Sequence, residues 1–346
     1  MDERMITDLY IRNFKSVKDV NLKCSRINVF IGEPNTGKSN ILETIALMHL
    51  FVDRYKKYTK SDLSFIFRIS QWNQLFPWRD LSQAISVEAI VDDMHIIRVK
   101  LQYNELIKWI DVLSGDNEIT ALNPIELDYD LDPEEDGIVR FGFYRFRIIS
   151  RFPSRESRFV VPPDAPNLLE VIRVKGRELI VELSRLFSEY GLELVIELPQ
   201  GLMRIQHTIY EEEIPIVASL PYSILSDSLK RIVFNLAIVQ GNEKMVIALE
   251  EPEAHTSPYY VKYLAEKIAR DEKGNQYFIS THNPYFLVSL LEKAPKEDVN
   301  VFVTFLENRK TKVKILTDEQ KENILDMYLD VFFNLDKFIE GLSQEV

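Results

Sequence analysis

Residues 27–39 read INVFIGEPNTGKS, a short apolar stretch that runs into a loop containing two glycines. The last eight of these residues, Gly32 to Ser39, fit the pattern G-x-x-x-x-G-K-[ST]. The pattern requires a strand before it and a helix after it, and both are predicted here. The helix is indicated by apolar residues at three- and four-residue spacings: Ile41, Leu42, Ile45, Met48, Phe51 and Val52.

The residue types of this loop suit the phosphates of ATP. The glycines allow backbone N–H groups to face phosphate oxygens, and the following helix adds the positive end of its dipole. Lys38 is expected to reach the β- and γ-phosphates, and Ser39 to offer its hydroxyl to Mg²⁺. The predicted nucleotide-binding residues are Gly32, Asn35, Thr36, Gly37, Lys38, Ser39 and Asn40.

A second motif follows the apolar stretch 245–249, where Glu250 and Glu251 open the sequence EEPEAH. Such a strand would place both carboxylates at the carboxyl edge of a parallel sheet, where these sheets bind ligands. Glu250 is expected to hold Mg²⁺, directly or through water. Glu251, which points the other way, is expected to orient and deprotonate the attacking water. Taken alone, the motif also fits a solvated acidic turn.

A third polar turn, ISTHNP at residues 279–284, again follows a short apolar strand. His282 in this turn is predicted to hydrogen-bond the γ-phosphate, although a histidine at a strand end also serves as a structural hydrogen-bonding group. The predicted catalytic residues are therefore Lys38, Glu251 and His282.

Together these motifs resemble the ATPase head of the SMC/RecF-type branch of the ABC ATPases. The similarity includes the segment 9–16 (LYIRNFKS), the phosphate loop, the acidic pair and His282. More narrowly, EEPEAH with a later STHNP is similar to the OLD-type (overcoming lysogenization defect) ATPases and their toprim-less relatives. The resemblance implies an α/β P-loop NTPase with a mixed, mostly parallel sheet flanked by helices, which uses Mg²⁺ to hydrolyse ATP.

The resemblance also implies a homodimer with ATP at its interface. In such heads a signature loop at a helix start contacts the nucleotide of the other subunit, and the best match is LSDSLKR at residues 225–231, with Ser226 as the contact. Ser228 stands where the family has glycine, which is expected to weaken dimerisation or turnover. The alternative is an ordinary serine-capped helix. Gln71 or Gln74 is the candidate for a glutamine that contacts metal and water.

The chain divides into an ATPase core, residues 1–55 and 216–346, and an inserted lid or arm region, residues 56–215, which is expected to continue the sheet in part. An acidic run at 126–136 precedes a segment rich in arginine and aromatic residues. This segment suits phosphates and unstacked bases, or else forms an amphipathic strand paired with the acidic run. The predicted DNA contacts are Arg140, Arg145, Arg147 and Arg151.

Composition limits the remaining functions. With 42 basic and 54 acidic side chains the net charge is −12, which argues against a protein that wraps nucleic acid with its whole surface. Because no uncharged apolar run approaches about 18 residues, we expect a cytoplasmic protein that does not enter the membrane. A single cysteine, Cys24, excludes intrachain disulfides and a cysteine-built metal site.

Only 64 residues follow His282, too few for a toprim nuclease domain, and long helical arms are missing, so a stand-alone head is expected. Such a head is expected to act as a switch on DNA, or on a nuclease or effector partner, in genome maintenance or phage defence. An ATP-binding scaffold with little turnover is the alternative. A nucleotidase or small-molecule kinase ranks last, because no acceptor pocket is identified.

Overall fold

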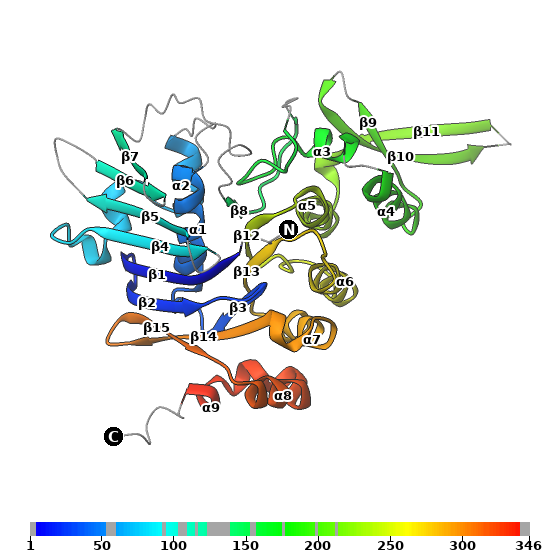
Figure 1. The fold of residues 1–346 in the computed structure, drawn as a ribbon. Coiled ribbons are helices and arrows are strands. Elements are labelled where there is room, and N and C mark those ends of the chain that lie inside the picture. The colour runs from blue at the N-terminus through cyan, green and yellow to red at the C-terminus, as the bar shows by residue number, and fades with distance from the viewer. Residues whose placement is uncertain are drawn as a thin grey trace.

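The computed structural model describes residues 5–52, 60–91, 95–102, 109–114, 117–122, 139–152, 157–174, 177–197, 200–211 and 214–339. These residues form three sheets and the helices that cover them (Figure 1). The fold class expected from the sequence, an α/β fold with a mostly parallel sheet flanked by helices, is confirmed.

The central sheet contains β3 (Ile27–Gly32), β8 (Arg140–Tyr144), β12 (Met245–Glu250), β13 (Gln276–Ser280), β14 (Val299–Glu307) and β15 (Lys310–Ile315). Their order is β15-β14-β3-β13-β12-β8, and all neighbours are parallel except β15 and β14. Strands β3, β12 and β13 are buried along nearly their whole length, which explains why they read as continuous apolar runs.

An antiparallel sheet covers one side of the central sheet, with helix α1 (Lys38–Val52) packed between the two. Because only one face of this sheet is buried, β4 alternates strictly between buried and half-buried residues. The strand order is β2-β1-β4-β5-β6-β7. The bounds are β1 (Ile6–Phe14), β2 (Val17–Lys23), β4 (Ile85–Val91), β5 (His95–Gln102), β6 (Trp109–Ser114) and β7 (Asn117–Leu122).

Helices cover the opposite side of the central sheet (Figure 1). Successive residues of β3 therefore enter different cores: Val29 and Ile31 face these helices, whereas Phe30 stacks on Phe302 on the α1 side. The helices are α3 (Leu168–Val174), α4 (Arg177–Ser188), α5 (Asp227–Gly241), α6 (Pro258–Ala269) and α7 (Pro284–Lys293), followed by α8 (Asp318–Met327) and α9 (Leu335–Ile339).

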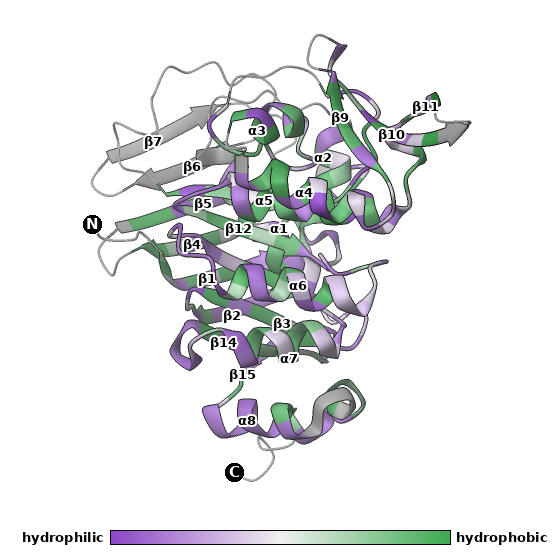
Figure 2. Ribbon diagram, turned by 90° about the vertical axis from the view of Figure 1, so that its right-hand side faces the viewer, coloured by the Kyte–Doolittle hydropathy of each residue, from purple (hydrophilic) through white to green (hydrophobic). Residues whose placement is uncertain are grey.

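A three-stranded sheet projects from the body as an arm (Figures 1 and 2). It comprises β9 (Glu193–Glu197), β10 (Leu202–Glu211) and β11 (Ile214–Pro221). Near the body Met203 and Ile205 are buried, whereas Ile209 and Ile216, which lie opposite each other farther along the hairpin, are exposed.

The segment between residues 56 and 215 contributes strands to all three sheets, together with helix α2 (Lys60–Phe67) and the short 3₁₀ turns η1 (Trp72–Leu75) and η2 (Pro77–Arg79). Its strand β8 pairs with β12 in the central sheet. No helix among the residues described has the length and apolarity needed to cross a membrane.

Candidate functional site

The phosphate loop joins β3 to α1, and its backbone is unusual at three residues. Gly32, Asn35 and Gly37 have φ angles of 149°, 68° and 102°. At Gly37 a side chain is also excluded by space, because a Cβ atom would lie 2.1 Å from the Thr311 hydroxyl. The loop therefore curves tightly against the β14–β15 hairpin.

Hydroxyl groups from neighbouring elements hold the loop in this shape. Thr36 Oγ1 shares a hydrogen bond of 2.7 Å with Thr304 Oγ1, so the Thr36 side chain faces the protein. Thr311 Oγ1 donates to the main-chain oxygen of Thr36 at 2.9 Å and contacts Ser16 Oγ at 2.7 Å. Asn40 Nδ2 donates to the same Ser16 oxygen at 2.7 Å. The β1–β2 turn and the β14–β15 hairpin thus hold the phosphate loop in place through these hydrogen bonds.

Lys38 is buried at the start of α1, and its ammonium group is held by the loop itself. Its Nζ atom donates to the main-chain oxygens of Gly32 at 2.9 Å and Glu33 at 2.8 Å. Burial lowers the pKa of Lys38 to about 8, although the carboxylates of Glu251, Glu33 and Glu250 oppose the change. An anionic ligand in the loop would favour the charged form.

The acidic pair follows β12, which pairs in parallel with β13 so that Glu250 lies opposite Ser280. The chain turns sharply at Glu251, whose φ is 43° and whose N–H donates to Ser280 O at 3.0 Å. The two side chains therefore meet different surroundings. That of Glu251 is 45% exposed, whereas that of Glu250 is 12% exposed.

His282 follows β13, and its Nε2 atom lies 3.6 Å from Glu251 Oε1. The pKa of His282 lies below its ordinary value, because burial and the Lys38 ammonium disfavour the imidazolium more than Glu251 and Glu33 favour it. The neutral ring can donate one hydrogen bond and accept another.

Glu253, which the sequence reading did not single out, lies buried beneath these two residues. Its Oε1 atom accepts a hydrogen bond of 2.5 Å from Thr281 Oγ1, which in turn accepts one from the Asn283 N–H. Burial raises the pKa of Glu253 to about 7. Glu253 therefore ties the loop after the acidic pair to the turn that carries His282.

The strand ends meet at a pocket of about 810 Å³, which falls within the usual size of ligand sites. The structure adds Ser16, Arg68, Trp78 and Arg309 to its lining. The predicted residues that line it are Asn35, Gly37, Lys38, Ser39, Asn40, Glu250, Glu251 and His282.

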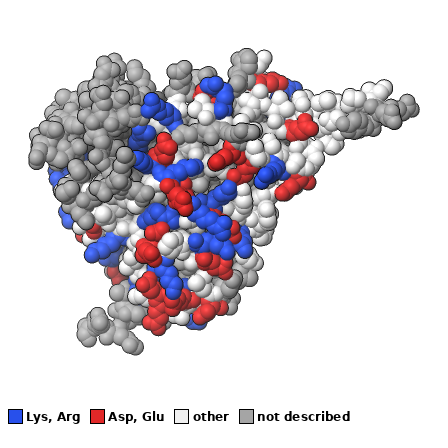
Figure 3. Space-filling view, turned by 45° about the vertical axis from the view of Figure 1, so that its right-hand side comes forward, with Lys and Arg blue, Asp and Glu red and all other residues white. Residues whose placement is uncertain are grey.

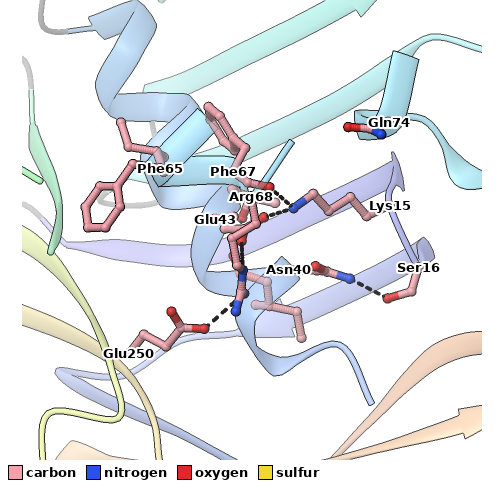
Figure 4. Close-up of polar contacts among 12 residues, drawn as sticks. Lys15, Ser16, Asn40, Glu43, Phe65, Phe67, Arg68, Gln74 and Glu250 are labelled. Atoms are coloured by element: carbon pink, nitrogen blue, oxygen red, sulfur yellow. Dashed lines mark hydrogen bonds and ion pairs between the residues drawn. The ribbon is translucent and has the colours of Figure 1, made fainter. Parts of the chain in front are cut away.

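Two arginines bind Glu250 from segments that the sequence does not connect with it. Arg145 follows β8, where Tyr144 lies opposite Leu249, and its Nη2 is 2.7 Å from Glu250 Oε2. Arg68, which follows α2, has its Nη2 atom 3.0 Å from Glu250 Oε1 (Figure 4). Burial would raise the pKa of Glu250, but Arg145 and Arg68 outweigh it and hold the pKa below its ordinary value.

A second carboxylate, that of Glu43 on α1, completes this cluster (Figure 4). Its side chain is fully buried and pairs with Lys15 from the β1–β2 turn, with Arg68 at 3.0 Å and with Arg145 at 3.5 Å. Because a buried carboxylate is costly unless it is paired, these cations account for its burial beside the phosphate loop.

The fit of Mg²⁺ to the site depends on Ser39 and Glu250, whose side chains are hydrogen-bonded to each other. A hydroxyl and a carboxylate are oxygen ligands of the kind that Mg²⁺ prefers. Within the described part of the chain, no group of three or more His, Cys, Asp or Glu side chains could hold a metal ion. The residues present therefore suit a metal that brings further ligands with it, as in a metal–nucleotide complex.

Known proteins share parts of this sequence and fold. Residues 5–157 match the protein family described as AAA ATPase domain. The Smc head domain of Pyrococcus furiosus, solved with an extended coiled coil and bound to the C-terminal domain of ScpA, superposes with a TM-score of 0.59 at 14% identity, over 94% of this chain and 99% of that one. This chain has the fold of an SMC head.

A second SMC head, solved with the C-winged helix domain of ScpA, agrees, with a TM-score of 0.55 at 16% identity over 91% of this chain and 99% of that one. No curated protein sequence matches the chain. The predicted SMC/RecF-type head is thus confirmed as a fold. The narrower likeness to OLD-type ATPases stays a prediction.

In this SMC-head fold the segment predicted as the signature begins helix α5. Ser226 is exposed, and its side chain accepts a hydrogen bond of 3.4 Å from the Leu229 N–H. Ser228 Oγ donates to the main-chain oxygen of His255. The Ser228 side chain is therefore turned toward its own chain. The helix is serine-capped, which is compatible with either role considered for it.

Neither predicted glutamine lines the pocket of this SMC-head fold. Gln74 Oε1 accepts hydrogen bonds from the N–H groups of Ser70 at 2.7 Å and Gln71 at 3.2 Å, and the side chain lies apart from Glu250 (Figure 4). The place beside Glu250 at the end of the adjacent strand is held by Arg145 instead. Arg145 directly follows the stretch 140–144, but no local feature of the sequence indicates that it pairs with Glu250.

In the segment rich in arginine and aromatic residues, strand β8 is buried and gives no support to the predicted DNA contacts. Phe141, Phe143 and Tyr144 are about 1% exposed and belong to the core, so they offer no stacking surface. Arg145 is paired inside the site and is not available to DNA. The acidic run at 126–136 lies outside the described residues.

The other predicted DNA contacts differ in their surroundings. Arg147 pairs with Asp164 and stacks on Phe65, Arg140 lies over the ring of Phe159, and Arg151 is exposed. On the face shown in Figure 3, basic side chains are interspersed with acidic ones. This arrangement provides no support for DNA binding at that face.

Proposed function

We propose that this chain binds ATP and hydrolyses it to ADP and phosphate. The observation that carries the proposal is the convergence of Lys38, Glu251 and His282 on one pocket beside a phosphate loop. The AAA ATPase match over residues 5–157 and the SMC-head fold support the same activity.

Each side chain has a role that follows from its surroundings. The N–H groups of the phosphate loop and the Lys38 ammonium bind the β- and γ-phosphates. Ser39 and Glu250 would hold Mg²⁺, which would supply positive charge to the phosphates. The exposed Glu251 carboxylate accepts a proton from water as the water oxygen bonds to the γ-phosphorus and the bond to the leaving ADP oxygen breaks. His282 donates a hydrogen bond to a γ-phosphate oxygen.

The proposal extends to a homodimer with ATP between the subunits. Ser226 and the following N–H groups open a helix of 15 residues at the surface, and this arrangement suits an anion carried by a second copy. The ATPase core would comprise residues 1–55 and 216–346, with residues 56–215 as the inserted lid or arm. Two SMC heads of the same fold are bound to ScpA domains, which supports a protein partner for this chain.

The biological role proposed is a nucleotide-driven switch on DNA, or on a nuclease or effector partner, in genome maintenance or phage defence. The second candidate is an ATP-binding scaffold with little turnover. It is favoured by one observation: both oxygens of Glu250 are already engaged by arginines.

The test is Mg²⁺-dependent ATP hydrolysis measured against protein concentration, for the wild type and Lys38→Ala. Specific activity that rises with concentration and disappears in Lys38→Ala would support a dimeric ATPase. Glu322→Gln serves as a matched surface control, because this carboxylate is 57% exposed and pairs only with Lys296 among the ion pairs described. ATP binding without turnover in the wild type would favour the scaffold, and absence of binding would reject both.

A further inference from the structure

Arg68 pairs with Glu250, the carboxylate that is expected to hold a metal ion. Its Nη2 atom is 3.0 Å from Glu250 Oε1, while Arg145 binds Oε2 and the Ser39 hydroxyl also reaches this carboxylate. Both oxygens of the expected metal ligand are therefore engaged. A metal at Oε1 would compete with the Arg68 guanidinium for this oxygen.

The two arginines differ in how firmly they are held. Arg145 is 13% exposed and also donates to the main-chain oxygens of residues 65–66 at the end of α2. Arg68 is 51% exposed, lines the pocket and is bound by two carboxylates, those of Glu250 and Glu43. Arg68 is therefore the arginine that can leave Glu250 with little rearrangement.

Glu43 gives Arg68 a second anchor. The Arg68 Nε and Nη2 atoms lie 3.3 Å and 3.0 Å from Glu43 Oε1, so the side chain can release Glu250 and keep Glu43. The backbone of Arg68 has φ of 52°, a left-handed conformation that is uncommon outside glycine and often found at functional sites.

The cluster also carries an excess of positive charge toward the phosphate loop. Three cations, Lys15, Arg68 and Arg145, surround two carboxylates, Glu43 and Glu250. If Glu250 binds a metal, Arg68 keeps only one of its two carboxylate partners, that of Glu43. A polyphosphate in the adjacent loop is then the nearest anion that can replace it.

We propose that Arg68 is a displaceable counter-ion of Glu250, which neutralises this carboxylate in the nucleotide-free chain and pairs with the polyphosphate once Mg²⁺ takes its place. The inference rests on the proposed ATP binding. It makes Arg68 the residue that sets how strongly ATP binding depends on the metal.

The test is a double-mutant cycle on metal-free binding. The affinity of the full chain for a fluorescent ATP analogue is measured in EDTA for the wild type, Glu250→Gln, Arg68→Gln and the double variant. Glu250→Gln should bind roughly three- to tenfold more tightly than the wild type, because Arg68 is released toward the phosphates. In the Arg68→Gln background the same substitution should have little effect.

Arg309→Gln is the matched control, because Arg309 lines the same pocket from the β14–β15 turn. In that background Glu250→Gln should keep its full effect. An equal effect with and without Arg68, or no tightening at all, overturns the inference. Arg68→Gln should remain folded, because Glu43 retains Lys15 and Arg145, and thermal melting checks this.

Repeating the measurements with excess Mg²⁺ distinguishes a failure of the proposed ATP binding from a failure of the role proposed for Arg68. A wild type that binds the analogue neither in EDTA nor with Mg²⁺ rejects the proposed function and this inference together. A wild type that binds with Mg²⁺, but whose cycle shows no coupling between Arg68 and Glu250, leaves ATP binding intact and rejects the role of Arg68 alone.

Discussion

Arg145 binds the Glu250 carboxylate through two nitrogen atoms, with Nε 2.8 Å and Nη2 2.7 Å from Oε2. The same guanidinium donates to the main-chain oxygens of Phe65 and Ile66 and lies 5.0 Å from the ring of Phe143. One side chain thus joins the ends of β8, β12 and α2. Arg145 therefore positions Glu250, the expected metal ligand, and also stabilises the packing of these three elements.

Replacement of Arg145 should destabilise the protein strongly. Arg145→Ala leaves two buried carboxylates short of a partner, and we expect the free energy of unfolding to fall by about 3–5 kcal/mol. Denaturant titration measures this. The control is Arg12→Ala, which removes an exposed pair with Asp19 and should cost less than about 1 kcal/mol. Equal losses in the two variants would contradict the account.

Gly37→Ala should destabilise the protein by more than the cost of placing alanine at a positive φ. The added Cβ would lie 2.1 Å from Thr311 Oγ1, so the hairpin or the loop must shift. Gly191→Ala is the matched control, because Gly191 also has a positive φ, of 67°, but its nearest neighbouring atom would be 3.6 Å away. The control should cost about 1 kcal/mol, and Gly37→Ala clearly more, in thermal or denaturant unfolding.

Glu253 should make stability fall as pH rises. Its pKa is about 7 in the folded chain, above the ordinary carboxyl value of 4.5, so between these values the folded state binds a proton that the unfolded state lacks. The free energy of unfolding therefore decreases through this window and stays lower above it.

Glu253→Gln removes the titrating group and keeps an oxygen that can accept from Thr281. Relative to the wild type, the variant should gain about 1–3 kcal/mol between pH 5 and pH 8. Denaturant unfolding at both pH values measures the gain. A difference between variant and wild type that does not change with pH would show that Glu253 is charged in the folded protein throughout.

Much of the core could be predicted from the sequence because its signals are local. The strand–loop–helix unit around Lys38, the acidic pair after 245–249 and the turn after 277–279 each combine an apolar run with polar residues directly behind it. The carboxyl ends of parallel strands then meet at one edge, as β3, β13 and β12 do.

The arginines of the site could not be predicted in this way. Arg145 reaches Glu250 because β8 pairs with β12, about a hundred residues later, and nothing local to residues 140–147 indicates that partner. Its alternation with aromatic residues favoured a surface strand, whereas β8 is buried on both faces. Arg68 depends likewise on the packing of α2 against α1.

The role of Glu251 in ATP hydrolysis is tested by a single-turnover measurement with labelled ATP and Mg²⁺ on the wild type and Glu251→Gln. We expect the wild type to convert bound ATP to ADP, and Glu251→Gln to bind ATP comparably but to form ADP at least about a hundredfold more slowly. ADP formation at equal rates in the two proteins would contradict the assignment of Glu251. Failure of the wild type to retain ATP would contradict the account as a whole.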